Sequence, residues 1–90
     1  MELCDIRKQI DAIDTEFVDL FIKRMELSAK VADYKKAHNM PIFVPEREQE
    51  ILASLSQKAG SDMALYVSSL YQKIFELSRD YQNDLNSDLK

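Results

Sequence analysis

The sequence contains few of the residues that break helices or carry metal and redox chemistry. Its 90 residues include one glycine, two prolines, one cysteine, one histidine and no tryptophan. So little glycine and proline argues against a fold of strands and tight turns, and favours an all-α fold with long helices. Cys4 has no second cysteine to pair with, and neither it nor His38 has the neighbours of a metal site. We therefore expect no metal ion, and a reduced thiol that fits the cytoplasm.

The chain also lacks the features that nucleic acids, membranes and cofactors require. The 12 basic and 16 acidic side chains give a formal net charge of −4, which favours neither nucleic acid nor an anionic membrane as a partner. No stretch approaches the ~20 apolar residues of a membrane span, and the early acids Glu2 and Asp5 argue against a signal peptide. There is no glycine-rich phosphate loop and no nucleophile–base pair, so an enzyme with this sequence is expected to need neither a cofactor nor a covalent intermediate.

The first part of the chain is typical of one very long helix. No glycine or proline occurs from Glu2 to His38, Asn39 suits the position after a helix end, and Pro41 forbids continuation. A helix over about 2–38 would be about 54 Å long, whereas a compact chain of this length has a radius of gyration of about 12 Å. The helix therefore extends beyond its own domain, and its apolar side needs a second chain to cover it.

The rest of the sequence predicts two shorter helices within the same single domain, residues 1–90. Pro45 suits the first turn of a helix and Gly60 suits the end of one. The predicted elements are a connection over 39–44, a second helix over about 45–59, a third helix over about 62–84 capped by Ser61 or Asp62, and a fraying tail over 83–90.

The apolar stripe of the first helix is interrupted by cations. Arg24 and Lys35 fall inside the stripe and Arg7 lies at its edge. A charge that faces a core is costly unless something pairs with it, and the helix offers no acid at a matching position. The pattern predicts a bound small anion, although both side chains could instead reach past the stripe to solvent. The stripe consists of Leu3, Ile6, Ile10, Ile13, Phe17, Leu20, Leu27 and Val31.

Polar residues on the other two helices could complete an anion site. Arg47 and Glu48 stand in the first turn of the second helix, where backbone N–H groups favour an anion. Ser78 and Gln82 are one turn apart, so a hydroxyl and an amide share one face of the third helix. Each residue alone also has a purely structural explanation, such as a helix-dipole partner for Glu48.

Taken in order, these segments resemble the all-helical chorismate mutases. The resemblance implies an intertwined homodimer of three-helix chains with two equivalent sites. It implies conversion of the small dianion chorismate to prephenate, in aromatic amino acid biosynthesis, by a pericyclic rearrangement without cofactor or metal. Because the chain ends soon after the third helix, we expect a stand-alone, monofunctional form without a fused dehydratase or dehydrogenase. The similar segments are 6–14, 24–27, 31–35, 41–48 and the pair Ser78 and Gln82.

The resemblance also assigns a role to each polar position. Lys35 and Gln82 would donate to the ether oxygen whose bond breaks, and Glu48 would accept from the ring hydroxyl. Many relatives have aspartate where this chain has Val44. Valine serves if that position contributes only a backbone N–H, and substrate affinity is weaker if a carboxylate is needed. The carboxylates and hydroxyl of the substrate would be held by Arg24, Arg47, Ser78 and, from the other subunit, Arg7.

Two other functions stay open at the level of sequence. An isochorismate-pyruvate lyase has the same scaffold, but such lyases tend to have an apolar residue where this chain has Glu48. A non-catalytic helical module, for dimerisation or for sensing an aromatic metabolite, would do better with leucine in place of Arg24 and Lys35. Glu48 therefore favours the mutase over the lyase, and the complete polar set favours an enzyme over a module.

Overall fold

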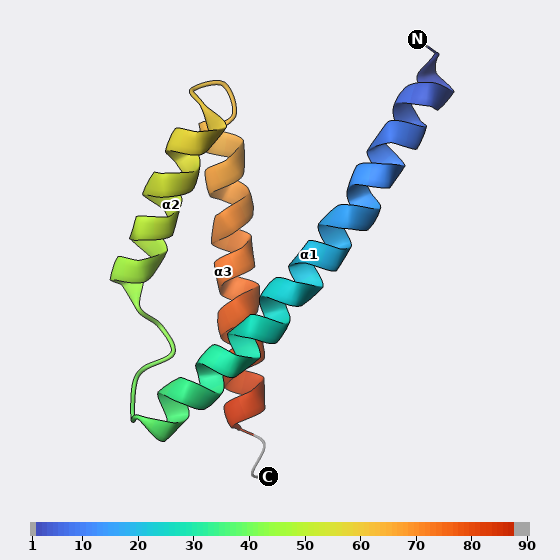
Figure 1. Ribbon diagram of the computed structural model, residues 1–90. Helices are drawn as coiled ribbons and strands as arrows, with labels where there is room; N and C mark the ends of the chain where they lie inside the picture. The colour runs from blue at the N-terminus through green and yellow to red at the C-terminus, as the bar shows by residue number, and fades with distance from the viewer. Residues whose placement is uncertain (1, 88–90) are drawn as a thin grey trace.

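The computed structural model describes residues 2–87 and consists of three helices (Figure 1). They are α1 (Leu3–Ala37), α2 (Pro45–Ala59) and α3 (Ala64–Asn86). The described residues contain no strand. The predicted all-α class with three helices, the first very long, is therefore confirmed.

α1 is one residue shorter at each end than the expected 2–38 and ends in a well-defined cap. Asn39 adopts a left-handed conformation with φ of 55°. The Met40 N–H donates to the Lys35 carbonyl at 2.8 Å, and the Asn39 N–H donates to the Lys36 carbonyl at 3.4 Å. This is the Schellman pattern, in which a residue in the left-handed region turns the chain out of the helix. The chain then runs through a short loop to Pro45, the first residue of α2.

The turn between α2 and α3 differs from the prediction. Gly60, with φ of 83°, ends α2 as expected. The N-cap of α3 is Met63, and neither Ser61 nor Asp62 caps the helix, because residues 61–63 form the turn that reverses the chain. The Ala64 N–H donates to the Gly60 carbonyl at 2.9 Å and closes this turn. α3 consequently starts and ends two residues later than expected; residues 83–86 of the predicted frayed tail are helical, and 88–90 lie outside the described residues.

α3 is the central element of the chain. It packs against both α1 and α2, whereas α1 and α2 do not pack on each other within the described residues. In Figure 1, α1 crosses the C-terminal half of α3, and the N-terminal half of α1 projects away from the α2–α3 hairpin. The radius of gyration is 16.4 Å and the longest dimension is 54 Å, against about 12 Å for the radius of gyration of a compact chain of this length. The projecting half of α1 is therefore not covered by the other described residues.

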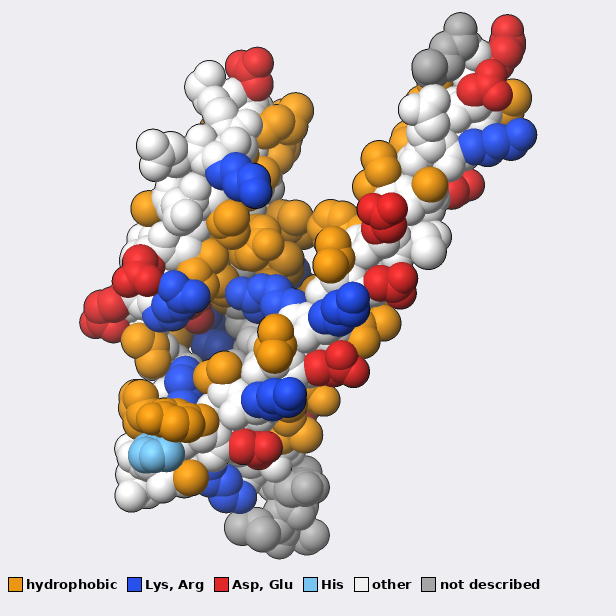
Figure 2. Space-filling view, viewed as in Figure 1, with side chains coloured by type: hydrophobic (Ala, Val, Ile, Leu, Met, Phe, Trp, Pro, Cys, Tyr) orange, Lys and Arg blue, Asp and Glu red, His pale blue; other side chains and the backbone are white. Residues whose placement is uncertain are grey.

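The described residues bury very little apolar surface. The buried apolar side chains are Ala32, Ile74 and Phe75. Every member of the apolar stripe predicted on α1 stays exposed, for example Ile13 at 60% and Phe17 at 48%. Figure 2 shows apolar side chains on both sides of the notch between α1 and the hairpin. Such a core is small for a chain of this length. None of the helices in the described part of the chain is long and apolar enough to cross a bilayer.

Small residues allow α1 and α3 to cross closely. Ala32 is 0% exposed, and one turn before it the Ser28 hydroxyl lies 2.9 Å from the Ser78 hydroxyl of α3. Both serines are buried, so the hydrogen bond between their hydroxyls helps to satisfy both groups. This crossing fixes the position of α1 relative to the polar residues of α3.

Candidate active site

A cavity of about 310 Å³ lies where α1, α3, the start of α2 and the preceding loop meet. Its opening is visible in Figure 2, where basic side chains gather at the base of the notch. All predicted site residues except Arg7 line the cavity. They are Arg24 and Lys35 from α1, Val44 from the loop, Arg47 and Glu48 from α2, and Ser78 and Gln82 from α3.

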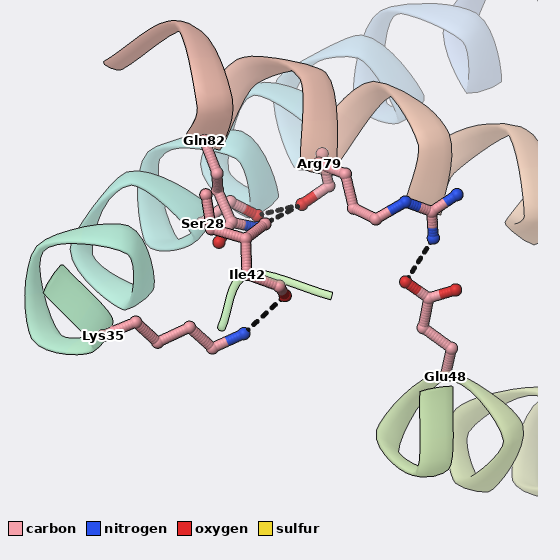
Figure 3. A network of polar contacts seen from close by, with 7 residues as sticks. Ser28, Lys35, Ile42, Glu48, Arg79 and Gln82 are labelled. Carbon is pink, nitrogen blue, oxygen red and sulfur yellow. Dashed lines mark hydrogen bonds and ion pairs between the residues drawn. The ribbon is translucent and has the colours of Figure 1, made fainter. Parts of the chain in front are cut away.

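The two cations of the apolar stripe are half-buried in this cavity, and no acid in the described residues pairs with either of them. The Lys35 Nζ donates to the Ile42 carbonyl at 2.8 Å (Figure 3). The Arg24 guanidinium lies over the rings of Tyr71 and Phe75, 5.7 and 5.8 Å from the centroids. Within residues 2–87 neither cation forms an ion pair. Aromatic faces and one carbonyl compensate a cation only in part, so both charges remain available to an anion in the cavity.

Buried polar side chains from α1 and α3 form one wall of the cavity. The Gln82 Nε2 donates to the Ser78 hydroxyl at 3.1 Å, and that hydroxyl also contacts Ser28. The Gln82 Oε1 is buried and has no hydrogen-bond partner in the described chain. The amide has two N–H donors, of which this contact uses one. Ser28 was missed from the sequence, although it lies one helical turn after Arg24.

The first turn of α2 carries two charged residues with different surroundings. The Arg47 Nη1 donates to Glu50 at 2.8 Å, and both side chains are largely exposed, so Arg47 lies at the rim. The Glu48 carboxylate is half-buried and accepts a hydrogen bond from Arg79 of α3 (Figure 3). Arg79 also lines the cavity and was not predicted. The available signal was its spacing, three residues before Gln82 and thus beside it on a helix.

Arg7 is remote from the cavity. It is exposed in the N-terminal half of α1, about 25 Å from Arg24 along the helix axis. Within a single chain it cannot share a small ligand with Arg24. Its contribution from a second subunit stays a prediction. No group of three or more potential metal-binding side chains is found among the described residues.

The family model for chorismate mutase type II matches residues 6–83. This chain belongs to that family. The T-protein of Enterobacter agglomerans is 47% identical over 58 residues, a match that covers 64% of this chain and 16% of the T-protein. The bifunctional chorismate mutase/prephenate dehydratase of Aquifex aeolicus is 43% identical over 54 residues, covering 60% of this chain and 15% of that protein.

A solved structure extends the similarity to nearly the whole chain. The crystal structure of chorismate mutase from Helicobacter pylori in complex with prephenate has a TM-score of 0.88 and 38% sequence identity. The match covers 98% of this chain and 97% of the Helicobacter pylori chain. The family resemblance is thereby confirmed. Because the match spans only about a sixth of the first relatives, the stand-alone, monofunctional form stays a prediction.

Proposed function

We propose that this chain is a chorismate mutase that converts chorismate to prephenate in aromatic amino acid biosynthesis. The observation that carries the proposal is the pair Arg24 and Lys35, two half-buried cations that form no ion pair within the described residues, in a cavity that also presents the Gln82 amide. A small dianion bound in this cavity would offset both charges. The similar Helicobacter pylori protein was crystallised with prephenate, a molecule of this class.

The proposed chemistry needs donors rather than a nucleophile. In the rearrangement one carbon–oxygen ether bond breaks while one carbon–carbon bond forms, and no proton or electron leaves the molecule. Lys35 has three donors and gives one to the Ile42 carbonyl, so the others can reach the ether oxygen. Gln82 offers its second N–H to the same oxygen. Donors aimed at charge that grows as the bond breaks are each worth about 10²–10³ in rate.

The remaining residues hold the substrate in its reactive shape. Arg24 and, from the other subunit, Arg7 would bind the two carboxylates. Glu48 would accept from the ring hydroxyl, and Arg47 and Ser78 would complete the carboxylate and hydroxyl contacts. The Val44 N–H makes no hydrogen bond within the described chain, which supports a backbone role for this position. Fixing a flexible dianion in one conformation contributes at most about 7–11 kcal/mol in the best intramolecular cases.

We further propose that the working unit is an intertwined homodimer, with Arg7 reaching the cavity of the other subunit. The exposed apolar stripe on α1 supports this assembly, because a second copy of α1 could cover it. An antiparallel partner helix would bring its Arg7 toward this Arg24. We place the enzyme in the cytoplasm, where the exposed Cys4 stays reduced.

The test is an assay of the purified chain with chorismate. We expect loss of chorismate and a product of unchanged mass that acid converts to phenylpyruvate, as prephenate does. Isochorismate supplied in parallel should yield no salicylate and no pyruvate. A chain that releases pyruvate from isochorismate and leaves chorismate intact is a lyase, and a chain inactive on both is a non-catalytic module.

A further inference from the structure

One ion pair at the cavity differs from the other ion pairs of the described chain. The pairs Arg47–Glu50 and Lys73–Glu76 are exposed and join residues three apart on one helix. The pair between Arg79 and Glu48 joins α3 to α2, with side-chain exposures of only 30% and 21%. Partial burial weakens solvent screening, so this pair constrains its members more than the exposed pairs do.

Arg79 is itself held on a second side. Its guanidinium lies over the ring of Phe43, 4.8 Å from the centroid. Phe43 belongs to the loop that precedes α2, so Arg79 links α3 to this loop as well as to the helix that follows it. A planar guanidinium stacked on a ring and bonded to a carboxylate has little rotational freedom.

The contact uses only one oxygen of Glu48. Oε2 accepts from Arg79, while Oε1 makes no hydrogen bond within the described chain. Figure 3 shows the carboxylate turned toward Arg79, with Lys35 and the Ile42 carbonyl across the site. Both Glu48 and Arg79 line the cavity. One carboxylate oxygen is thus fixed by protein, and the other remains for a donor on a bound molecule.

We propose that Arg79 is a positioning residue that orients the Glu48 carboxylate toward the ring hydroxyl of the substrate and offsets its charge. The proposal rests on the function proposed above. A substrate dianion is repelled by an uncompensated carboxylate, and the neighbouring guanidinium cancels that repulsion. An unanchored glutamate would also sample several rotamers, of which few point at the hydroxyl.

A double-mutant cycle on kcat/KM tests the proposal. Arg79→Met keeps the length of the side chain and removes its charge. In the wild-type background we expect it to lower kcat/KM about tenfold, and in the Glu48→Gln background less than about twofold. In Glu48→Gln the neutral amide has no charge for Arg79 to offset, and the carboxylate that Arg79 orients is absent. Lys73→Met, which removes an exposed cation of the same helix, is the control and leaves kcat/KM unchanged.

The alternatives give different patterns. If Arg79 binds the substrate directly, Arg79→Met lowers kcat/KM equally in both backgrounds, and this result overturns the proposal. An Arg79→Met variant that loses no activity in the wild-type background also overturns it. Arg79→Lys should restore most of the activity lost in Arg79→Met. If Arg79→Met does not fold, the cycle with Arg79→Gln, which also removes the charge, decides by the same criterion. A wild-type chain without mutase activity overturns the proposed function and this inference together, whereas an active wild type with an additive cycle overturns this inference alone.

Discussion

Arg24 shows how a charge on an apolar face can be tolerated without an acid. Its guanidinium lies over two rings of α3, and Arg24 is only half-buried. Stacking on rings offsets part of the desolvation and leaves the N–H groups free. We therefore expect this residue to bind an anion.

Replacing this arginine should separate activity from stability. We expect Arg24→Leu to abolish mutase activity, because a carboxylate of the substrate loses its partner, while the fold keeps or gains stability. The measurements are kcat/KM and the urea midpoint at one protein concentration. Lys23→Leu, an exposed neighbour on α1, is the control and should keep full activity. Marked unfolding of Arg24→Leu would instead show that this arginine is structural.

Gln82 permits a prediction about pH. It is buried, at 6% exposure, and its amide does not titrate. In Gln82→Glu the new carboxyl donates a hydrogen bond only when protonated, and burial raises the pKa of that carboxyl. Activity of the variant should be present below that pKa and fall about tenfold per pH unit above it. A pH–rate profile measures this, with the exposed Gln72→Glu on α3 as the control. Full activity of Gln82→Glu at pH 8 would remove Gln82 from the ether-oxygen role.

At the residue scale, the sequence revealed the polar positions that break an apolar stripe. Arg24, Lys35, Ser78 and Gln82 could be predicted because helical periodicity says which positions face inward. Arg79 was missed because its position lies off the stripe of α3. Its spacing from Gln82 was the one signal, and its contacts depend on how α2 and the preceding loop fold against α3. The cavity brings the predicted residues together, and their individual roles stay predictions until assayed.

At the scale of elements, the close crossing of α1 and α3 decides the geometry of the cavity. Ala32 is fully buried at this crossing, so a larger side chain must push the helices apart. We expect Ala32→Leu to destabilise the fold by about 1–3 kcal/mol and to reduce activity. Urea unfolding at constant protein concentration measures the first effect. Ala37→Leu, the same change at the exposed end of α1, is the control, and equal stability of the two variants would refute the prediction.

The helices themselves were largely predictable. The length of α1 follows from the absence of glycine and proline, and its end follows from Asn39, which adopts the left-handed conformation that ends a helix. The start of α3 was predicted wrongly, because Ser61 and Asp62 resemble cap residues but lie in the turn after Gly60. Local sequence cannot say how many residues a turn uses before the next helix begins.

At the scale of the whole molecule, the described chain exposes an apolar surface of the kind that a second subunit usually covers. The apolar stripe on α1 is exposed and the core is small. The sequence predicted the exposed stripe, because the number of residues gives both the length of α1 and the radius of a compact chain, and the helix is longer than such a chain can cover. The orientation of a second copy did not follow from the sequence, because it depends on how two such surfaces fit.

Mixing two inactive variants tests whether the cavity is shared. Arg7→Ala and Arg24→Leu should each be inactive alone. Refolded together in equal amounts, half of the dimers contain one of each chain, and one of their two sites combines an intact Arg24 with an intact Arg7. We therefore expect about a quarter of wild-type activity to return.

The control is a mixture of Arg24→Leu and Lys35→Met, whose changes fall in the cavity of one chain. No mixed dimer of this pair has an intact site, so no activity should return. Equal recovery in both mixtures, or none in the first, would contradict a site completed by Arg7 of the other subunit.

The uncovered length of α1 also bears on how the protein reaches its native state. With so few apolar side chains enclosed by one chain, a newly synthesised copy gains little from folding alone. If the proposed homodimer is the folded unit, encounter with another copy becomes a folding step, and we expect the refolding kinetics to be second-order in chain concentration. The half-time of refolding, followed by circular dichroism, should be inversely proportional to the chain concentration.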